Sequence, residues 1–381
     1  MNTIKLISIF YEVPYLKNNN LFNEAIVTNY RWLKWAPFIN NELNKLNIEV
    51  VTSDIAIIKI QKNEISPSEV GVVQFMDDKD SLLLLKKGCI PLLLLTFESP
   101  VYATNFFSNP KKYLCPYRAV HVFSGLVKYL SDYKGDINIL NGYGFYEVDE
   151  ILEPIKWKDR DFMVFVTSNI YPLSVSNKYL KHYSTVHIYF KRLFKLIISL
   201  KLKQIIETKS ISLSNLRYDS IIFFGEQNLL RIYGRGWENL NLLPYEYKFK
   251  LSKIYNQINP QVCINKITTI SKYKFTLCFE NARFDGYISE KIIECFVAGT
   301  IPIYYGAYDI NQFIPKNCFI DYNDFKNLNE LNSYLINLNV TEAENYINNA
   351  RIFLTSENGL KYSFEYFQKT IYNSLKNVLK K

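Results

Sequence analysis

Short apolar runs alternate with helix-like segments along this 381-residue chain, and this alternation constrains the fold more than any other feature. Ile90–Leu95 is an uninterrupted apolar run, which is typical of a strand buried on both faces of a parallel sheet. Thr3–Phe10 and Ile48–Val51 have the composition of further strands, and Ala25–Leu46 carries helical periodicity. The pattern predicts a doubly wound α/β domain up to about residue 150.

A second alternating series begins near residue 161 and predicts a second α/β domain. Its expected elements are the strands Phe162–Thr167, Leu230–Tyr233, Phe275–Phe279 and Ile301–Tyr305, and a helix over 289–298. Residues 200–228 are interpreted as an insertion of uncertain structure. Glu147–Asp161 is acidic, then basic, and contains a proline, so we interpret it as the linker. We therefore expect domains at 1–150 and 151–355, in keeping with the chain length.

Residues 356–381 predict a basic amphipathic helix. Apolar residues recur at spacings of three and four among lysines, at Phe364, Phe367, Ile371, Leu375 and Val378. Such a helix can lie on an anionic membrane, or it can dock its apolar stripe on the protein itself. We expect it to pack back on the N-terminal domain.

The formal net charge of +9 favours anionic partners such as a phosphorylated small molecule or an anionic membrane. We expect no nucleic-acid partner, because the chain contains no dense Lys/Arg run and no nucleic-acid motif. The 30 Tyr and 26 Phe residues are interpreted chiefly as an aromatic-rich core, although aromatic rings also stack on sugars and bases.

Cysteine and histidine usage argues against a metal centre. The six cysteines lie singly with no CxxC pair, which is typical of reduced core residues, and three histidines leave little material for a His/Cys cage. Ser81–Phe97 is the most apolar segment, but Lys86-Lys87-Gly88 divides it into an expected helix and a buried strand, not a membrane span. With no cleavable signal at its start, we expect a cytoplasmic protein.

The loop FENARFDGYISEK, residues 279–291, concentrates polar side chains between a predicted strand and a predicted helix. Open α/β sheets bind ligands at the carboxyl ends of their strands, where this loop is expected. Lys291 and the N-terminus of the helix, with Ser289 as its expected cap, suit a diphosphate.

Three further side chains of this loop suit a nucleotide. Glu290 can accept hydrogen bonds from the hydroxyls of a ribose, and Asn281 and Tyr287 can bond to phosphate or sugar. Polar loops and acidic first turns of helices are also routine, so these residues alone leave a ligand site and a solvated loop both open.

Tyr273–Ala307 resembles the signature of the α1,3/4-fucosyltransferases, glycosyltransferase family 10. The residues that carry the resemblance are Phe279-Glu280-Asn281, Tyr287, Glu290-Lys291 and Ile301-Pro302-Ile303-Tyr304-Tyr305-Gly306. Phe313–Phe325 is similar to the family's closing stretch, and Leu94–Pro100 resembles its Glu-Ser-Pro segment. Shorter similarities occur at Val164–Asn169 and Leu230–Gly236.

The resemblance implies a GT-B fold, with two Rossmann-like domains facing across a cleft. It also implies an inverting enzyme that moves L-fucose from GDP-fucose to a hydroxyl of an acceptor glycan, in α1,3 or α1,4 linkage. Residues 1–150 would bind the acceptor and supply the catalytic base, and residues 151–355 would bind the donor. By the same resemblance Glu98 is the base.

The family's donor site is expected at Asn281, Tyr287, Glu290 and Lys291, with a further basic residue for the diphosphate. Lys191 and Arg192 both align with that residue. We favour Arg192, because a guanidinium matches phosphate oxygens bidentately, but Lys191 stays open and both could belong to a solvated helix face.

No metal or other cofactor is then expected, because fixed positive charges can stabilise the departing GDP. Asp159-Arg160-Asp161 has the DxD pattern by which other glycosyltransferases hold a metal. Because it precedes its strand and lies in the expected linker, we interpret it as a solvated turn.

Two other functions remain open: a transferase of the same fold with another nucleotide sugar, and a sugar- or nucleotide-binding protein without turnover. A scaffold on a membrane surface is a third. The family role suggests a bacterial-type cytoplasmic enzyme that glycosylates lipopolysaccharide, capsule or protein, with peripheral contact to the inner face of the membrane as an open alternative. Acceptor and oligomeric state are not indicated.

Overall fold

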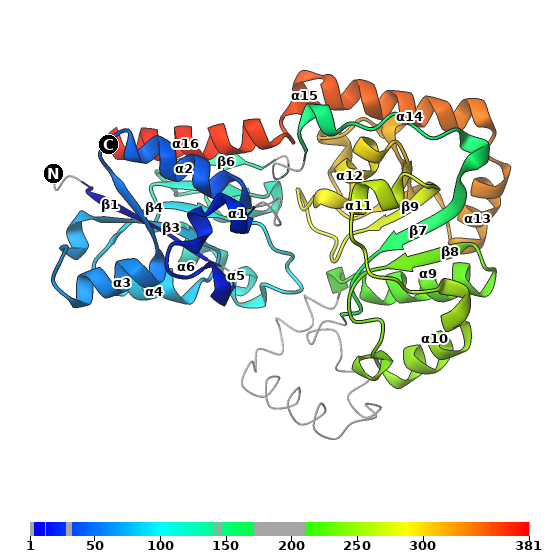
Figure 1. The fold of residues 1–381 in the computed structure, drawn as a ribbon, viewed down its shortest axis with the longest axis horizontal. Coiled ribbons are helices and arrows are strands. Elements are labelled where there is room, and N and C mark those ends of the chain that lie inside the picture. Colours follow the sequence, from blue (N-terminus) through cyan, green and yellow to red (C-terminus); the bar gives the residue numbers. More distant parts are fainter. Residues whose placement is uncertain are drawn as a thin grey trace. The chain divides into compact units, whose positions relative to one another are not determined.

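The computed structural model describes residues 4–11, 13–27, 33–140, 142, 146–170 and 210–380. The chain divides into two compact units: unit 1 is residues 1–98, 105–147 and 361–381, and unit 2 is residues 99–104 and 148–360. Each unit contains one parallel sheet flanked by helices (Figure 1). The predicted α/β class is thus confirmed in both halves of the chain.

Unit 1 contains a six-stranded sheet in the order β2-β1-β3-β4-β5-β6, and every pairing is parallel. Its strands are β1 Leu6–Ile9, β2 Glu49–Thr52, β3 Val70–Phe75, β4 Ile90–Leu95, β5 Ala119–Val122 and β6 Asp136–Ile139. The helices of residues 4–142 are α1 Glu24–Val27, α2 Trp35–Asn44, α3 Ser53–Gln61, α4 Lys79–Lys86, α5 Thr104–Ser108 and α6 Pro110–Leu114.

Unit 2 contains a five-stranded parallel sheet in the order β11-β10-β9-β7-β8. Its strands are β7 Asp161–Val166, β8 Leu230–Tyr233, β9 Tyr273–Phe279, β10 Ile301–Tyr305 and β11 Ile320–Asp321. Its described helices are α9 Ser214–Glu226, α10 Tyr245–Ile258, α11 Lys266–Ile270, α12 Glu290–Ala298, α13 Leu328–Asn337, α14 Val340–Thr355 and α15 Glu357–Leu360.

The strand order of unit 2 reverses between β7 and β9. After β7 the chain forms the edge strand β8, and it then returns to the other side of β7 with β9. In an open α/β sheet such a reversal leaves a crevice outside the carboxyl ends of the two central strands. The fold therefore prepares a ligand site directly after Val166 and Phe279.

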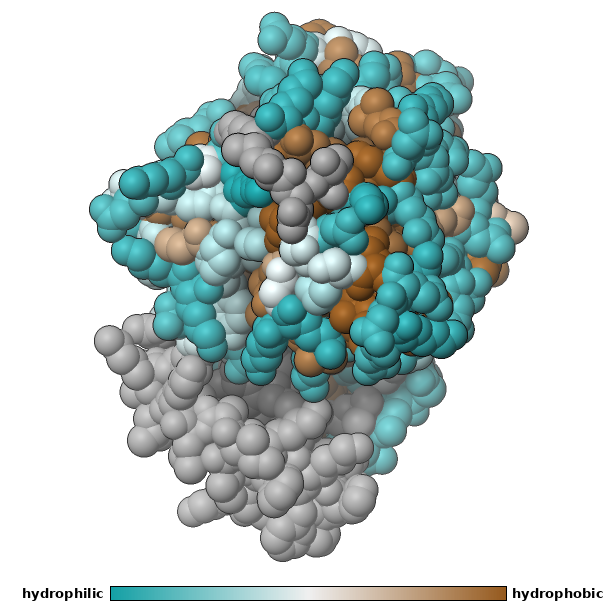
Figure 2. All heavy atoms as spheres, turned by 90° about the vertical axis from the view of Figure 1, so that its left-hand side faces the viewer, coloured by the Kyte–Doolittle hydropathy of each residue, from teal (hydrophilic) through white to brown (hydrophobic). Residues whose placement is uncertain are grey.

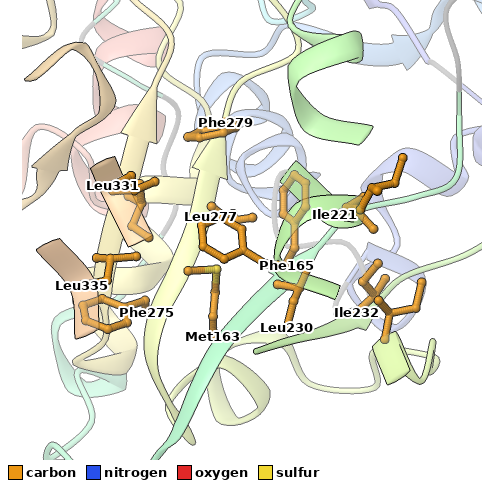
Figure 3. Packing of buried hydrophobic residues seen from close by; sticks show 14 of the residues in the cluster. Met163, Phe165, Ile221, Leu230, Ile232, Phe275, Leu277, Phe279, Leu331 and Leu335 are labelled. Carbon is orange, nitrogen blue, oxygen red and sulfur yellow. The ribbon is translucent and has the colours of Figure 1, made fainter. Parts of the chain in front are cut away.

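Alternate apolar side chains on one face of the sheet form a core cluster of unit 2. Figure 3 shows Met163 and Phe165 of β7 beside Phe275 and Leu277 of β9, all at most 1% exposed. Helix α9 contributes to the same cluster, which corrects the interpretation of residues 200–228 as an insertion without assigned structure. Its buried residues do not follow one narrow stripe, so the helical period was not visible in the sequence.

One further expectation was wrong in detail. Ala25–Leu46 is not one helix: α1 is Glu24–Val27 and α2 begins at Trp35, two residues before Pro37. Proline has no N–H to donate within a helix and is tolerated only in the first turn, which explains a new start here.

The chain passes from unit 1 to unit 2 between residues 147 and 148, at the start of the expected linker. The residues that follow pack on unit 2, where Leu152 N donates to Val297 O at 2.9 Å.

The most apolar segment divides as expected into helix α4 and the buried strand β4. No helix in the described part of the chain is both long and apolar enough to cross a membrane. On the face drawn in Figure 2, hydrophilic side chains predominate and hydrophobic ones are visible between them. Four cysteines are buried, but Cys115 is exposed, which differs from the expectation of core residues.

Helix α16, Phe364–Lys380, packs its apolar face on unit 1 (Figure 1, red). The ring of Phe367 contacts that of Trp35 at 6.5 Å between centroids and that of Phe97 at 5.6 Å. Polar contacts also hold the helix: Ser374 Oγ lies 2.8 Å from Nε2 of the buried His121. Because burial lowers the pKa of His121 to about 3, this imidazole is neutral at ordinary pH.

We predict that Phe367→Ala lowers the free energy of unfolding by about 3–5 kcal/mol, the usual cost of truncating a buried phenylalanine. The measurement is urea unfolding of the full chain followed by circular dichroism. Tyr366→Ala is the matched control, because Tyr366 is the neighbouring aromatic residue and is 44% exposed. Equal free energies of unfolding for the two variants would show that docking of α16 contributes little to stability.

Candidate functional site

A pocket of about 300 Å³ lies in unit 2 where its strand order reverses. Thr167 and Ser168 line it directly after β7, and Asn281 lines it after β9. Gly234, after β8, is required here, because a Cβ at this position would lie 2.1 Å from Thr167 O and its φ is +149°. The ends of three neighbouring strands therefore form one wall of the pocket.

A buried ion pair joins β9 to the first turn of α12. The carboxylate of Glu280 is 0% exposed and accepts hydrogen bonds from N and Oγ of Ser289, both at 2.7 Å. Lys291 Nζ donates to the same carboxylate at 3.0 Å and to Ser289 Oγ at 2.8 Å. Ser289 occupies the N-cap position, but its side chain makes no capping hydrogen bond, so the expected capping role was wrong.

Glu290 is held between two lysines. Lys266 Nζ donates to its carboxylate at 3.3 Å and also forms an ion pair with Glu294, one turn further along α12. Burial alone would raise the pKa of Glu290, but the positive charges of Lys291 and Lys266 outweigh burial and lower the pKa to about 2. Lys266 was not predicted as a site residue, because nothing in the sequence around the start of α11 indicated a role in the site.

Arg217 of α9 is the second cation of the pocket that sequence reasoning missed. Its guanidinium donates to Asn281 Oδ1 at 2.5 Å and to Thr167 Oγ1, so it spans the gap between the ends of β9 and β7. The guanidinium also lies over the Phe165 ring, 5.4 Å from its centroid. In the described part of the chain Arg217 forms no ion pair, so no carboxylate offsets its charge directly.

The structure brings Asn281, Glu290 and Lys291 together in this pocket. Tyr287 is 2% exposed and reaches the pocket through Asn281, whose Nδ2 donates to its hydroxyl at 3.4 Å. Its predicted contact with a ligand stays a prediction, and in this structure its hydroxyl supports Asn281.

The structure places Glu98 but does not describe the two other predicted residues. Glu98 follows β4 in unit 1, is partly exposed and is not among the pocket-lining residues. Lys191 and Arg192 lie outside the described residues, so their assignment stays a prediction.

The expected solvated turn at the DxD pattern is only partly observed. Asp159 ends a short 3-10 helix and Asp161 begins β7, and both are exposed. Arg160 between them is 5% exposed and donates to Gly299 O at 2.5 Å and to Ile155 O at 2.8 Å. The residues described contain no group of three or more His, Cys, Asp or Glu arranged to hold a metal ion.

The arrangement is suited to a doubly charged anion. Lys291 and Arg217 supply positive charge, and the nine-residue helix α12 directs its N-terminus to the same pocket. Glu290 provides a carboxylate beside these cations that can accept hydrogen bonds from sugar hydroxyls. A nucleoside diphosphate that carries a sugar combines these two chemical requirements.

The fold defines the class of protein first. The structure of Anabaena HepE in complex with UDP and glucose matches 98% of this chain and 99% of its own chain, with a TM-score of 0.50 at 10% identity. The chain therefore has the GT-B fold of glycosyltransferases, as predicted.

Sequence comparison then finds a family match within unit 2. Residues 247–351 match the model of the C-terminal part of glycosyltransferase family 10 (fucosyltransferase). An α-(1,3)-fucosyltransferase of Helicobacter pylori is 46% identical over 72 residues, 19% of this chain and 15% of the relative. Mouse α-(1,3)-fucosyltransferase 4 is 37% identical over 99 residues, 25% of this chain and 23% of the relative. The chain is thus similar to family 10 glycosyltransferases over this part, and each match spans less than a quarter of the curated relative.

We predict that the affinity for GDP changes less than about twofold between about pH 7.5 and 8.5, a range below the titration of the guanine base. Burial would lower the pKa of Lys291, but Glu280 and Glu290 outweigh it and raise the pKa, so Lys291 stays charged throughout. Glu290 stays ionised as well, because its stabilising contribution is lost only as the pH falls through about 2. The measurement is calorimetric titration at several pH values. A decrease in affinity within this range would contradict the proposed charge state of Lys291.

Proposed function

We propose that this protein is an inverting fucosyltransferase that transfers L-fucose from GDP-fucose to a hydroxyl of an acceptor glycan. One observation carries the proposal: Arg217 and Lys291 line one pocket at the strand reversal of unit 2, and Lys291 lies within the residues that match the family 10 model. Relatives that match this chain are named α-(1,3)- and α-(1,4)-fucosyltransferases, and this supports the choice of donor. Linkage to the 3- or 4-hydroxyl is proposed on the same ground.

In the proposed mechanism the diphosphate lies against Arg217, Lys291 and the N-terminus of α12. These groups stabilise the negative charge that develops on GDP as the bond to the anomeric carbon of fucose breaks. Glu290 accepts hydrogen bonds from the ribose hydroxyls, and Lys266 keeps that carboxylate ionised and in position.

Unit 1 is proposed to bind the acceptor and to supply the base. Glu98 takes the proton of the acceptor hydroxyl as its oxygen attacks the anomeric carbon. The attack and the departure of GDP occur on opposite sides, so the configuration inverts. General base catalysis of this kind contributes typically about 10²–10⁴-fold. We propose that fixed protein charges stabilise the leaving group without a metal ion.

The donor is tested by calorimetric titration with GDP-fucose, GDP-mannose, UDP-galactose and GDP, each with and without EDTA. We expect saturable binding of GDP and GDP-fucose that EDTA does not change. Binding of UDP-galactose alone would favour the alternative of another nucleotide sugar, and dependence on Mn²⁺ would overturn the metal-free mechanism.

Arg217→Ala is predicted to weaken GDP binding by roughly 10- to 100-fold, because a charge-assisted hydrogen bond contributes about 1.5–3 kcal/mol. Arg217→Lys should recover part of the loss, since it keeps the charge without the bidentate fork. Arg231→Ala is the matched control: Arg231 lies on β8 of the same unit and donates to Gln257 O outside the pocket. If both alanine variants bind GDP like the wild type, Arg217 does not hold the diphosphate.

Glu98→Gln is predicted to abolish transfer while GDP-fucose binds as in the wild type, because the amide cannot accept the proton. The readout is fucose transfer from GDP-fucose to N-acetyllactosamine, chosen because relatives named 4-galactosyl-N-acetylglucosaminide 3-α-L-fucosyltransferase 9 match this chain. Glu147→Gln is the control, since Glu147 is also a partly exposed carboxylate of unit 1 and pairs with Lys34 on the surface. Transfer at the wild-type rate by Glu98→Gln would exclude Glu98 as the base.

A further inference from the structure

Tyr308 is an exposed aromatic ring held in a fixed orientation next to the loop that carries the site residues. It follows β10 by three positions and is 57% exposed. The guanidinium of Arg283 lies over its ring, with the guanidinium carbon 4.1 Å from the ring centroid. Exposure alone is ordinary for a single surface residue, and it is the fixed orientation of the ring that distinguishes Tyr308.

Further contacts hold the Arg283 side chain in place. Its guanidinium also lies over the ring of Tyr305, 4.2 Å from the centroid, and donates to the Tyr305 hydroxyl at 2.7 Å. A second donation reaches Asn323 Oδ1 at 3.1 Å, and the Arg283 backbone N–H donates to Ile211 O at 2.7 Å. Tyr305, Arg283 and Tyr308 thus form a stack, which we call the tyrosine–arginine stack.

The stack is anchored in the core at one end and linked to the site loop. The ring of Tyr305 contacts Tyr322 at 5.1 Å and Phe279, the last residue of β9, at 6.1 Å. Asp309, next to Tyr308, accepts a hydrogen bond from Gly286 N at 2.7 Å. The position of the Tyr308 ring is therefore coupled to residues 279–291, which include Asn281 and Lys291.

The sheet geometry determines how far Tyr308 lies from the donor pocket. Strand β10 is the neighbour of β9, and β9 is the neighbour of β7. Adjacent strands are about 4.8 Å apart, so the carboxyl end of β10 lies roughly 5 Å from that of β9 and roughly 10 Å from that of β7. Tyr308 does not line the pocket of Arg217 and Lys291, although it follows a strand that ends at the same edge of the sheet.

We propose that Tyr308 is a stacking platform for a pyranose ring of the acceptor glycan. An aromatic face suits the C–H face of a sugar, and the tyrosine hydroxyl and the carboxylate of the adjacent Asp309 suit its hydroxyls. A ring that is already oriented loses little conformational entropy on binding. This inference rests on the proposed function, because the acceptor assignment follows from placing the donor in the adjacent pocket.

The stack also explains why an arginine is present in this loop. A lysine could supply the charge, but only the planar guanidinium can lie between two rings and still donate to Tyr305 and Asn323. Arg283 is a positioning residue in this account, and Tyr308 is the residue that touches the sugar.

Transfer assays with GDP-fucose and N-acetyllactosamine test the platform. Tyr308→Ala is expected to raise the acceptor KM roughly tenfold with little change in kcat, while Tyr308→Phe stays near the wild type. Arg283→Lys is expected to have a smaller effect in the same direction. Tyr245→Ala is the matched control, because Tyr245 is 54% exposed and also stacks on a neighbour, Phe249, elsewhere on unit 2.

Two binding measurements separate failure of the platform from failure of the proposed function. Calorimetric titration with GDP should give the same affinity for Tyr308→Ala and the wild type, which shows that the donor site is intact. Saturation-transfer NMR with galactose, N-acetylglucosamine and N-acetyllactosamine reports sugar contact without any transfer reaction.

The outcomes are distinct. Sugar signals that depend on Tyr308 would support the platform even if the wild type transferred no fucose, in which case only the proposed function fails. An unchanged KM for Tyr308→Ala, the same rise for Tyr245→Ala, or no saturation transfer to any of the three sugars in the wild type would overturn the platform.

Discussion

The carboxylate of Glu280 is the group on which the candidate site depends. It is completely buried at the end of β9, where an unpaired charge would cost several kcal/mol. Two hydrogen bonds from Ser289 and an ion pair with Lys291 offset that cost. These contacts form only if the chain turns back after β9 and begins α12 against the end of that strand. Gly306 leaves the necessary room, since a Cβ there would lie 2.4 Å from Glu280 Cγ.

The charges around this pair are arranged so that positive charge remains available to a ligand. Lys291 is balanced by Glu280 and Glu290, and Lys266 by Glu290 and Glu294. Arg217 has neutral partners, Asn281 and Thr167, which fix its direction without reducing its charge. An incoming diphosphate would therefore meet cations that are already in position, and binding would require little reorganisation.

Much of this fold could be predicted from the sequence because its strong signals are local. Ile90–Leu95 and Tyr273–Phe279 are buried parallel strands, and such strands consist of continuous apolar residues. Glu290 and Lys291 could be assigned to a site because the order of strand, loop and helix places them at a carboxyl edge. Helix α9 could not be recognised, because its buried residues occupy several sides and leave no amphipathic stripe. The reorientation of Ser289 toward Glu280 depends on a buried charge that no local pattern indicates.

The basic residue for the diphosphate illustrates a limit of reasoning from sequence spacing. Arg217 lies 50 positions after Thr167 and 64 before Asn281, yet it bonds to both, because α9 packs against the sheet between their strands. When the intervening segment is long, distance along the chain does not identify the residue that reaches the pocket. What the chemistry requires is a cation over the gap between β7 and β9, and any helix that crosses that gap can supply it. Spatial position at the strand reversal is thus a criterion that applies to Arg217, whereas Lys191 and Arg192 stay predictions because they lie outside the described residues.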